Sequence, residues 1–337
     1  MANPPPIYIE AGKTYHVDTC KPLIKACKAG NVKLYALARG SYPGRRLGKT
    51  SLPGVSTIGY WDAVGKQDWG LEYHRNEGIE LTFLETGRIP ILVENQTYLL
   101  EPGDLTITRP WQPHKVGTPH ISASRLHWII IDVGVRRPNQ EWKWPKWLVL
   151  IQSDIKVLTT MLRHNEQPVW RDVNNEIRHC FKQIAKAVAE NHNRNNISRI
   201  TVFLNELLLL LLEMLRQRGI SLNPSLSSSR RSVELFMNEL CGSLDNLSHP
   251  WSIVNMAEHC GLGVTSFIQY CKQLTNMTPT QFLNQSRVDA SVKLLIEKPE
   301  MSITDIALTC GFSSSQYFAT VFRRYRGCCP KRLRLKN

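Results

Sequence analysis

Residues 303–312 decide the fold of the carboxyl-terminal part of this chain, and they read ITDIALTCGF. Residues 253–262 read IVNMAEHCGL and repeat the same pattern earlier in the chain. In each copy an alanine stands four residues before a glycine, and aromatic or aliphatic residues follow at the positions expected of a second helix. This spacing is typical of a helix-turn-helix, and it occurs twice.

The small residues of the two copies have steric reasons. Ala257 and Ala307 stand where the first helix packs against the second, so a larger side chain would push the helices apart. Gly261 and Gly311 fall in the turn, where a positive φ is readily adopted only by glycine. The residues that should then lock the second helix inward are spaced i, i+3: Phe267 with Tyr270, and Phe318 with Val321.

The remaining positions of each second helix should face outward, where they could meet the major groove of DNA. Glutamine can bond to two edge atoms of adenine, small hydroxyls can bond to base edges or phosphates, and arginine can neutralise phosphates. A single helix predicted over residues 281–298 would hold the two second helices roughly 34 Å apart, one turn of DNA. The residues predicted to contact DNA are Thr265, Ser266, Gln269, Lys272, Ser315, Gln316, Ala319, Thr320, Arg323 and Arg324.

The composition predicts a globular protein that favours polyanions. The 337 residues carry a formal net charge of +14, which favours a partner such as nucleic acid. The longest aliphatic run, residues 207–212, is far too short to cross a bilayer, and no secretory signal is recognisable near the start. Nine cysteines without a Cys-x-x-Cys pair argue against a disulfide framework or a structural zinc. We therefore expect a cytoplasmic protein that does not contact membranes.

Strand patterns dominate the amino-terminal part, from about residue 30 to residue 135. Short runs rich in β-branched and aromatic residues alternate with turn residues, and no helical pattern separates them. Such closely spaced strands predict an all-β sandwich or barrel. The clearest runs are residues 81–84, 89–93, 97–100, 105–108 and 126–131.

Helical periodicity follows over residues 173–191 and 198–218. The second of these helices is apolar over more than one stripe, which fits either packing within the chain or a subunit interface. A serine-rich stretch comes next. We expect an α+β multidomain protein whose parts are a sensing domain (1–168), a helical packing or dimerisation element (169–220), a linker (221–231) and an all-α domain with two helix-turn-helix units (232–337).

Residues 250–334 resemble the DNA-binding domain of the AraC/XylS family of bacterial transcription regulators. The second copy carries the most specific part of this likeness, at residues 306–307, 311–313, 317–318 and 321–325 and in Pro330 with Arg334. Arg287 falls in the connecting helix, where the family also tends to carry arginine. The first copy departs from the family pattern at residues 263–264, 268 and 271, and Cys329 stands where threonine is usual. The resemblance implies a homodimer that binds double-stranded DNA and contacts RNA polymerase.

Residues 97–114 are similar to the cupin-like sensor domain that is common in that family. The resemblance implies an amino-terminal cupin-like β-barrel with flanking helices, which binds a small-molecule effector such as a sugar. Trp128 lies on the strand where sugar-responsive members place an aromatic ring, although simple core packing would explain a tryptophan there equally well. The candidate effector-binding residues are His74, Glu80, Arg109, His114 and Trp128.

Metal-dependent cupin enzymes supply a competing hypothesis. They usually place two histidines, a glutamate and a later histidine around one ion, and here Asn76 stands in place of the second histidine. His74, Glu80 and His114 could still form a three-ligand open site. A third hypothesis is an architectural protein that binds DNA without reading its sequence. The favoured interpretation is a sequence-specific transcription activator, controlled by an effector in the barrel, that is not an enzyme and has neither a cofactor nor a bound metal.

Overall fold

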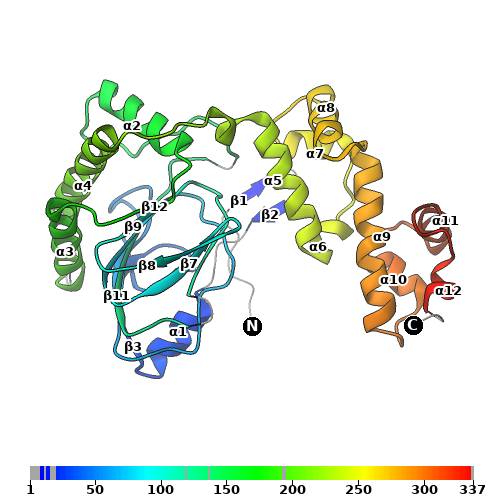
Figure 1. Ribbon diagram of the computed structural model, residues 1–337, viewed down its shortest axis with the longest axis horizontal. Coiled ribbons are helices and arrows are strands. Elements are labelled where there is room, and N and C mark those ends of the chain that lie inside the picture. Colours follow the sequence, from blue (N-terminus) through cyan, green and yellow to red (C-terminus); the bar gives the residue numbers. More distant parts are fainter. Residues whose placement is uncertain are drawn as a thin grey trace. The chain divides into compact units, whose positions relative to one another are not determined.

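The computed structural model describes residues 8–10, 13–15, 20–117, 120–135, 137–191 and 195–334. The chain forms two compact units, Met1–Ser227 and Ser228–Asn337. Figure 1 shows strands and helices in the first unit and helices in the second, which confirms the α+β architecture expected from the sequence. The stretch 221–231 is less irregular than its serines indicated, because it contains a 3-10 helix at Pro224–Ser227 and the start of an α-helix at Ser229.

Strands that pair mostly in the antiparallel direction form the frame of the first unit. They are β1 (Tyr8–Glu10), β2 (Lys13–Tyr15), β3 (Val32–Ala38), β4 (Arg45–Arg46), β5 (Val55–Ala63), β6 (Ile79–Thr86), β7 (Ile89–Val93), β8 (Gln96–Leu100), β9 (Leu105–Thr108), β10 (His114–Val116), β11 (Ser124–Ile131) and β12 (Val169–Trp170). One sheet has the order β12-β9-β6-β11-β5-β3-β4, in which β3 and β4 pair in parallel. A second sheet has the order β10-β7-β8, and β1 pairs with β2.

The central strand β11 is buried on both of its faces. Successive side chains of a strand point to opposite faces of the sheet. Trp128 and Ile130 belong to the apolar core enclosed by the two sheets, whereas Ile129 and Ile131 belong to a core on the opposite face. This double burial explains why residues 126–131 read as a nearly continuous apolar run instead of an alternating one.

Helices cover the core that contains Ile129 and Ile131. The first unit contains α1 (Lys21–Lys28), α2 (Gln152–His164), α3 (Asn175–Ala189) and α4 (Ile197–Arg218). Phe181 of α3 stacks on Phe83 of β6, with ring centroids 5.0 Å apart. The apolar side chains of α4 are mostly buried in the same core, so packing within the chain accounts for much of that helix. Val202 and Leu209 remain outside, with 63% and 41% of their surface exposed.

The described part of the second unit consists of helices: α5 (Ser229–Gly242), α6 (Leu244–Ser248), α7 (Ile253–His259), α8 (Val264–Thr275), α9 (Pro279–Glu297), α10 (Ile303–Thr309), α11 (Ser315–Arg326) and α12 (Pro330–Arg334). The long helix α9 starts earlier than residue 281, where the sequence pattern begins. Pro279 occupies its first turn, and Thr278 and Gln281 form a reciprocal capping box. No helix within the described ranges is both long and apolar enough to span a membrane.

Candidate functional site

Each of the two predicted helix-turn-helix units exists in the structure. The first consists of α7 and α8 and the second of α10 and α11. The turn glycines Gly261 and Gly311 have φ values of 65° and 85°, which confirms the positive φ expected there. Ala257 and Ala307 are buried at the helix contacts, as their small size indicated.

The inward residues of α8 and α11 leave a polar face toward solvent. Phe267 and Phe318 are fully buried, so each helix is anchored by an aromatic ring. The positions predicted to contact DNA are exposed in α8, and in α11 Ser315 and Ala319 are half-buried while the rest are exposed. The exposed ones are Thr265, Ser266, Gln269, Lys272, Gln316, Thr320, Arg323 and Arg324.

Contacts with α9 orient α11. Asn284 Nδ2 donates to the hydroxyl of Tyr317 at 3.2 Å, and the Tyr325 hydroxyl donates to the Gln281 carbonyl at 3.1 Å. The guanidinium of Arg326 also forms an ion pair with a carboxylate of α9. The sequence pattern did not reveal these contacts, because each pair is separated by more than thirty residues.

The basic end of the chain divides into structural and exposed cations. Arg326 is paired with Asp289 at 2.5 Å, and Arg334 Nη2 donates to the Met301 carbonyl at 2.8 Å. Arg323 and Arg324 are exposed on α11. Lys331 and Arg332 of α12 are exposed as well, so these four cations are positioned where a phosphate backbone could meet them.

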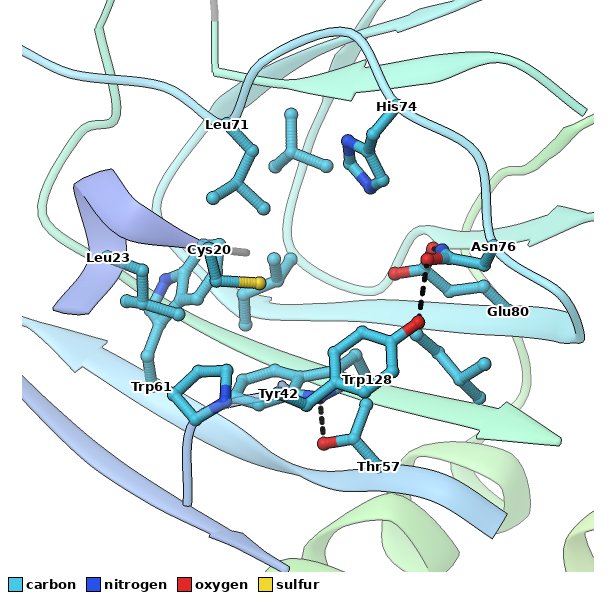
Figure 2. Close-up of a pocket in the computed structure, with 14 residues that line it drawn as sticks. Cys20, Leu23, Tyr42, Thr57, Trp61, Leu71, His74, Asn76, Glu80 and Trp128 are labelled. Atoms are coloured by element: carbon cyan, nitrogen blue, oxygen red, sulfur yellow. Dashed lines mark hydrogen bonds between the residues drawn. The ribbon is translucent and has the colours of Figure 1, made fainter. Parts of the chain in front are cut away.

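A pocket opens in the first unit between the two sheets. Its apolar wall contains Trp61, Leu71 and Trp128, and the indole of Trp128 donates to Thr57 Oγ1 at 3.1 Å (Figure 2). The rings of Trp61 and Trp128 are 5.8 Å apart and tilted by 45°. Side chains of β6 and of the loop before it form the opposite, polar end, which includes Glu80. The pocket thus presents aromatic faces to one side of a ligand and polar atoms to the other.

The candidate effector-binding residues do not all line this pocket. His74, Glu80 and Trp128 line it. His114 lies behind Glu80, with Nε2 2.7 Å from Glu80 Oε2. Arg109 lies elsewhere, because its guanidinium donates to the Asn165 carbonyl and forms an ion pair with Glu94 at 3.3 Å. A role for Arg109 in effector binding therefore has no support from its position.

Glu80 is the centre of a buried polar network. Oε2 accepts from Asn76 Nδ2 at 2.6 Å, and Oε1 accepts from Thr82 Oγ1 at 3.1 Å. Burial raises the pKa of the Glu80 carboxyl, but the charge and hydrogen bond of His114 and the charge of His74 outweigh it, so that the pKa lies below its usual value. Glu80 is therefore a carboxylate at neutral pH, with its oxygens directed at neighbouring donors.

Both histidines near Glu80 are oriented by backbone carbonyls. Nδ1 of His74 lies 2.7 Å from the Glu72 carbonyl, and Nδ1 of His114 lies 2.9 Å from the Gln112 carbonyl. A carbonyl only accepts hydrogen bonds, so each Nδ1 carries a proton. Nε2 of His114 must then either carry a second proton or share a cation with Glu80, since a bare Nε2 and a carboxylate oxygen would both be acceptors.

The same residues fit a divalent metal ion in part. Possible ligand atoms of His74, Glu80 and His114 all lie within 4.8 Å of one another. The Nδ1 atoms of the two histidines lie next to backbone carbonyls. A histidine ligand whose Nε2 faces a metal usually has such a hydrogen-bond partner at its other ring nitrogen. Asn76, in place of the second histidine of metal-dependent cupins, contacts Glu80 instead of supplying an imidazole. Three protein ligands remain, a number that zinc sites with an open position also use.

Several residues that line the pocket were not predicted from the sequence. Tyr42, whose hydroxyl donates to Asn76 Oδ1 at 3.1 Å, comes from the loop after β3, and Trp61 comes from β5 (Figure 2). Both precede the region of the cupin-like motif. Residues 55–63, VSTIGYWDA, do not alternate between apolar and polar side chains, and nothing in the sequence around Tyr42 indicates a pocket.

Comparison with known proteins finds a match in each unit. Residues 256–336 match a helix-turn-helix domain family, and residues 63–130 match a cupin domain family. The HTH-type transcriptional activator RhaS of Escherichia coli strain SE11 is 31% identical over 168 residues, which make up 49% of this chain and 56% of that protein. RhaS of strain K12 / DH10B is 30% identical over the same length. The chain thus spans little more than half the length of these curated relatives.

Two solved structures align with different shares of the chain. The crystal structure of ToxT from Vibrio cholerae covers 82% of this chain and 96% of that one, at 12% sequence identity and a TM-score of 0.32. The DNA-binding domain of AdpA in complex with a target DNA covers 31% of this chain and 91% of that one, at 24% identity and a TM-score of 0.29.

Proposed function

We propose that this chain is a sequence-specific DNA-binding regulator of transcription of the AraC type and not an enzyme. The matches to a cupin domain family and to a helix-turn-helix domain family, together with the likeness to RhaS, support this proposal. The observation that carries the proposal is the pair of helix-turn-helix units in one compact unit. Each has its recognition helix anchored by a buried phenylalanine and its polar face exposed. In this proposal α8 and α11 enter successive major grooves of one duplex.

The effector of this regulator is a small molecule that binds in the pocket of the first unit. An uncharged polyol such as a sugar fits the lining, because Trp61 and Trp128 offer aromatic faces while Glu80 and Asn76 offer polar atoms. The described lining contains no lysine or arginine, which disfavours an anionic effector. The cavity has a volume of about 40 Å³, so it must widen to admit a sugar.

We further propose that the protein is a dimeric activator. The regulator acts as an activator in the cytoplasm, contacts RNA polymerase and forms a homodimer through the exposed apolar side chains of α4. Val202 and Leu209 are the support for that surface. Effector binding changes the populations of first-unit conformations and thereby how the dimer presents its recognition helices.

Selection of bound sequences from random DNA by the full-length chain tests the proposal. A discrete motif with two segments about one helical turn apart is the expected result. Uniform recovery of all sequences would contradict sequence reading and would favour an architectural role.

Replacing Gln316 with alanine should weaken binding to the selected site by about 1–3 kcal/mol, because an exposed glutamine on α11 can make a bidentate contact with a base. Affinity for unrelated DNA should stay nearly unchanged. Equilibrium titration of both DNAs at one salt concentration measures the difference. An equal loss on the two DNAs would refute a base-reading role for Gln316.

The matched control is Arg324→Ala on the same helix. Arg324 is exposed and suited to a phosphate contact, so its loss should weaken binding to both DNAs. The slope of log affinity against log salt concentration should fall by about one. A salt slope equal to that of the wild type would show that Arg324 does not contact phosphate.

A metal-dependent cupin site is a second candidate, favoured by the grouping of His74, Glu80 and His114. A bound divalent metal would act there as a Lewis acid or as an effector-holding ion. If the candidate is correct, calorimetric titration of the full-length chain with Zn²⁺ or Mn²⁺ should give one site per chain, and His114→Gln should remove it. The exposed His179, replaced with glutamine, serves as the control. Heat of binding that is unchanged in the His114 variant would exclude this site.

A further inference from the structure

Two separate apolar cores hold the two helix-turn-helix units. Phe267 and Leu283 belong to the first core, and Val288 and Phe318 belong to the second. Ala290 on α9 packs against both. Since α8 and α11 lie in different cores, their relative position depends on α9 and on whatever ties each core to it.

Arg287 makes such a tie to the first core. It lies in the middle of α9 and is buried, with 8% of its surface exposed. Its Nε donates to the Leu247 carbonyl at 2.8 Å, and its Nη2 donates to the His249 carbonyl at 2.8 Å. These carbonyls belong to the end of α6 and to the connection that leads into α7. The planar guanidinium thus holds two nearby backbone groups in one fixed geometry.

The same guanidinium also lies near the turn of the second helix-turn-helix, between α10 and α11. Its Cζ lies 6.0 Å from the centroid of the Phe312 ring. A Cβ on Gly311 would lie 2.9 Å from Arg287 Nη2 and 2.7 Å from the Leu247 carbonyl oxygen. Three segments therefore meet at one side chain: the connection before α7, the helix α9, and the turn between α10 and α11.

Because the Arg287 guanidinium is buried, it needs both of its carbonyl partners. Burial lowers the pKa of the Arg287 guanidinium, yet an arginine remains protonated at neutral pH. Its two carbonyl bonds replace water around the charge, so movement of either partner would leave a buried donor unsatisfied. These bonds therefore oppose a small displacement of one helix-turn-helix relative to the other.

We propose that Arg287 is a positioning residue that fixes the separation and rotation of α8 relative to α11, so that the protein accepts DNA sites of one internal spacing. This inference rests on the proposed function. Inserting one base pair between the two contacted segments moves them about 3.4 Å along the duplex and about 35° around it. Two recognition helices that Arg287 holds in one relative position cannot follow that shift. Without the bonds of Arg287 the two helices can adjust their positions.

The test compares full-length wild type with Arg287→Gln on three DNA fragments. They are the selected site, the same site with one base pair inserted between its segments, and a fragment that keeps only the segment bound by α11. The wild type should lose affinity about tenfold or more on insertion, the order of one mismatched base pair. The variant should lose less than about threefold, and the two proteins should bind the single-segment fragment alike.

Two further variants test whether the effect depends on the two carbonyl hydrogen bonds of Arg287. Arg287→Lys keeps the charge but cannot make both carbonyl bonds in the same plane, so its insertion penalty should lie between those of wild type and Arg287→Gln. Lys293→Gln changes an exposed cation on the same helix and should keep the wild-type penalty. Thermal denaturation of each chain shows whether it is folded.

Equal insertion penalties for wild type and Arg287→Gln would overturn the inference. If Arg287→Gln does not fold, Arg287→Lys decides, and a wild-type penalty in that variant overturns the inference in the same way. A wild type that selects no two-segment site at all would contradict the proposed function itself, which is a different result from a spacing preference that does not depend on Arg287.

Discussion

Replacing Gly311 with alanine is expected to destabilise the second unit by about 2–5 kcal/mol and to remove measurable binding to the selected DNA site. Gly311 has a φ of 85°, and an L-residue with a side chain reaches that region at a cost of about 1–2 kcal/mol. A Cβ at this position would lie 2.6 Å from the Cα of Ser248 and 2.7 Å from the carbonyl oxygen of Leu247. Both are backbone atoms, so relieving the overlap requires the helices to separate, which adds about 1–3 kcal/mol.

The matched control is Gly327→Ala at the end of α11. Gly327 also has a positive φ, 70°, but no heavy atom lies within 4 Å of where its Cβ would be. This variant should therefore lose only the conformational contribution of about 1–2 kcal/mol and should keep its DNA binding. Urea denaturation of the full-length variants gives the two losses. Equal losses would mean that the approach of residues 247–248 to the turn is unimportant for stability.

The second large effect is expected for Glu80→Ala, which should destabilise the first unit by about 3–5 kcal/mol. Glu80 is buried and accepts hydrogen bonds from Asn76 and Thr82 while pairing with His114. Removing the carboxylate leaves three buried polar side chains without their common partner. Tryptophan fluorescence reports this transition during urea denaturation, because Trp128 lines the same pocket.

A surface ion pair of the same unit provides the reference for Glu80. Glu101 pairs with Arg88 at 3.2 Å, and the two side chains are 55% and 69% exposed. Glu101→Ala should change the stability by only about 0–1 kcal/mol, because solvent screens an exposed pair. A loss for Glu80→Ala no larger than that would show that the buried network contributes little.

The second unit was legible in the sequence because its requirements are local. Ala307 and Gly311 stand four residues apart in one turn, and their size and φ follow from that turn alone. The contacts of Arg287 could not be read in the same way. Its partners lie about forty residues earlier in the chain, and no periodicity links an arginine to a distant carbonyl.

The first unit was predicted at the level of strands but only in part at the level of its pocket. Residues 89–93 and 105–108 form β7 and β9 with the expected bounds. Arg109, a candidate effector contact, lies just after the end of β9 and bonds to Asn165 and Glu94 instead of lining the pocket, and neither distant partner can be read from the sequence. Tyr42 was missed because it comes from a loop, where hydrophobic periodicity says nothing about direction.

Strand β11 gives the first unit a mechanical property as well as a frame. Trp128 lines the cavity on one face of the sheet, whereas Ile129 and Ile131 belong to the core on the other face, which also contains side chains of α3 and α4. Adjacent residues of a hydrogen-bonded strand cannot shift independently, since each is tied to β5 and β6 at once. A molecule that displaced the indole would therefore also act on the packing of Ile129, the next residue of the strand, in the core that includes side chains of α3 and α4. A ligand seated against Trp128 would in this way be coupled to the opposite core through the backbone of β11.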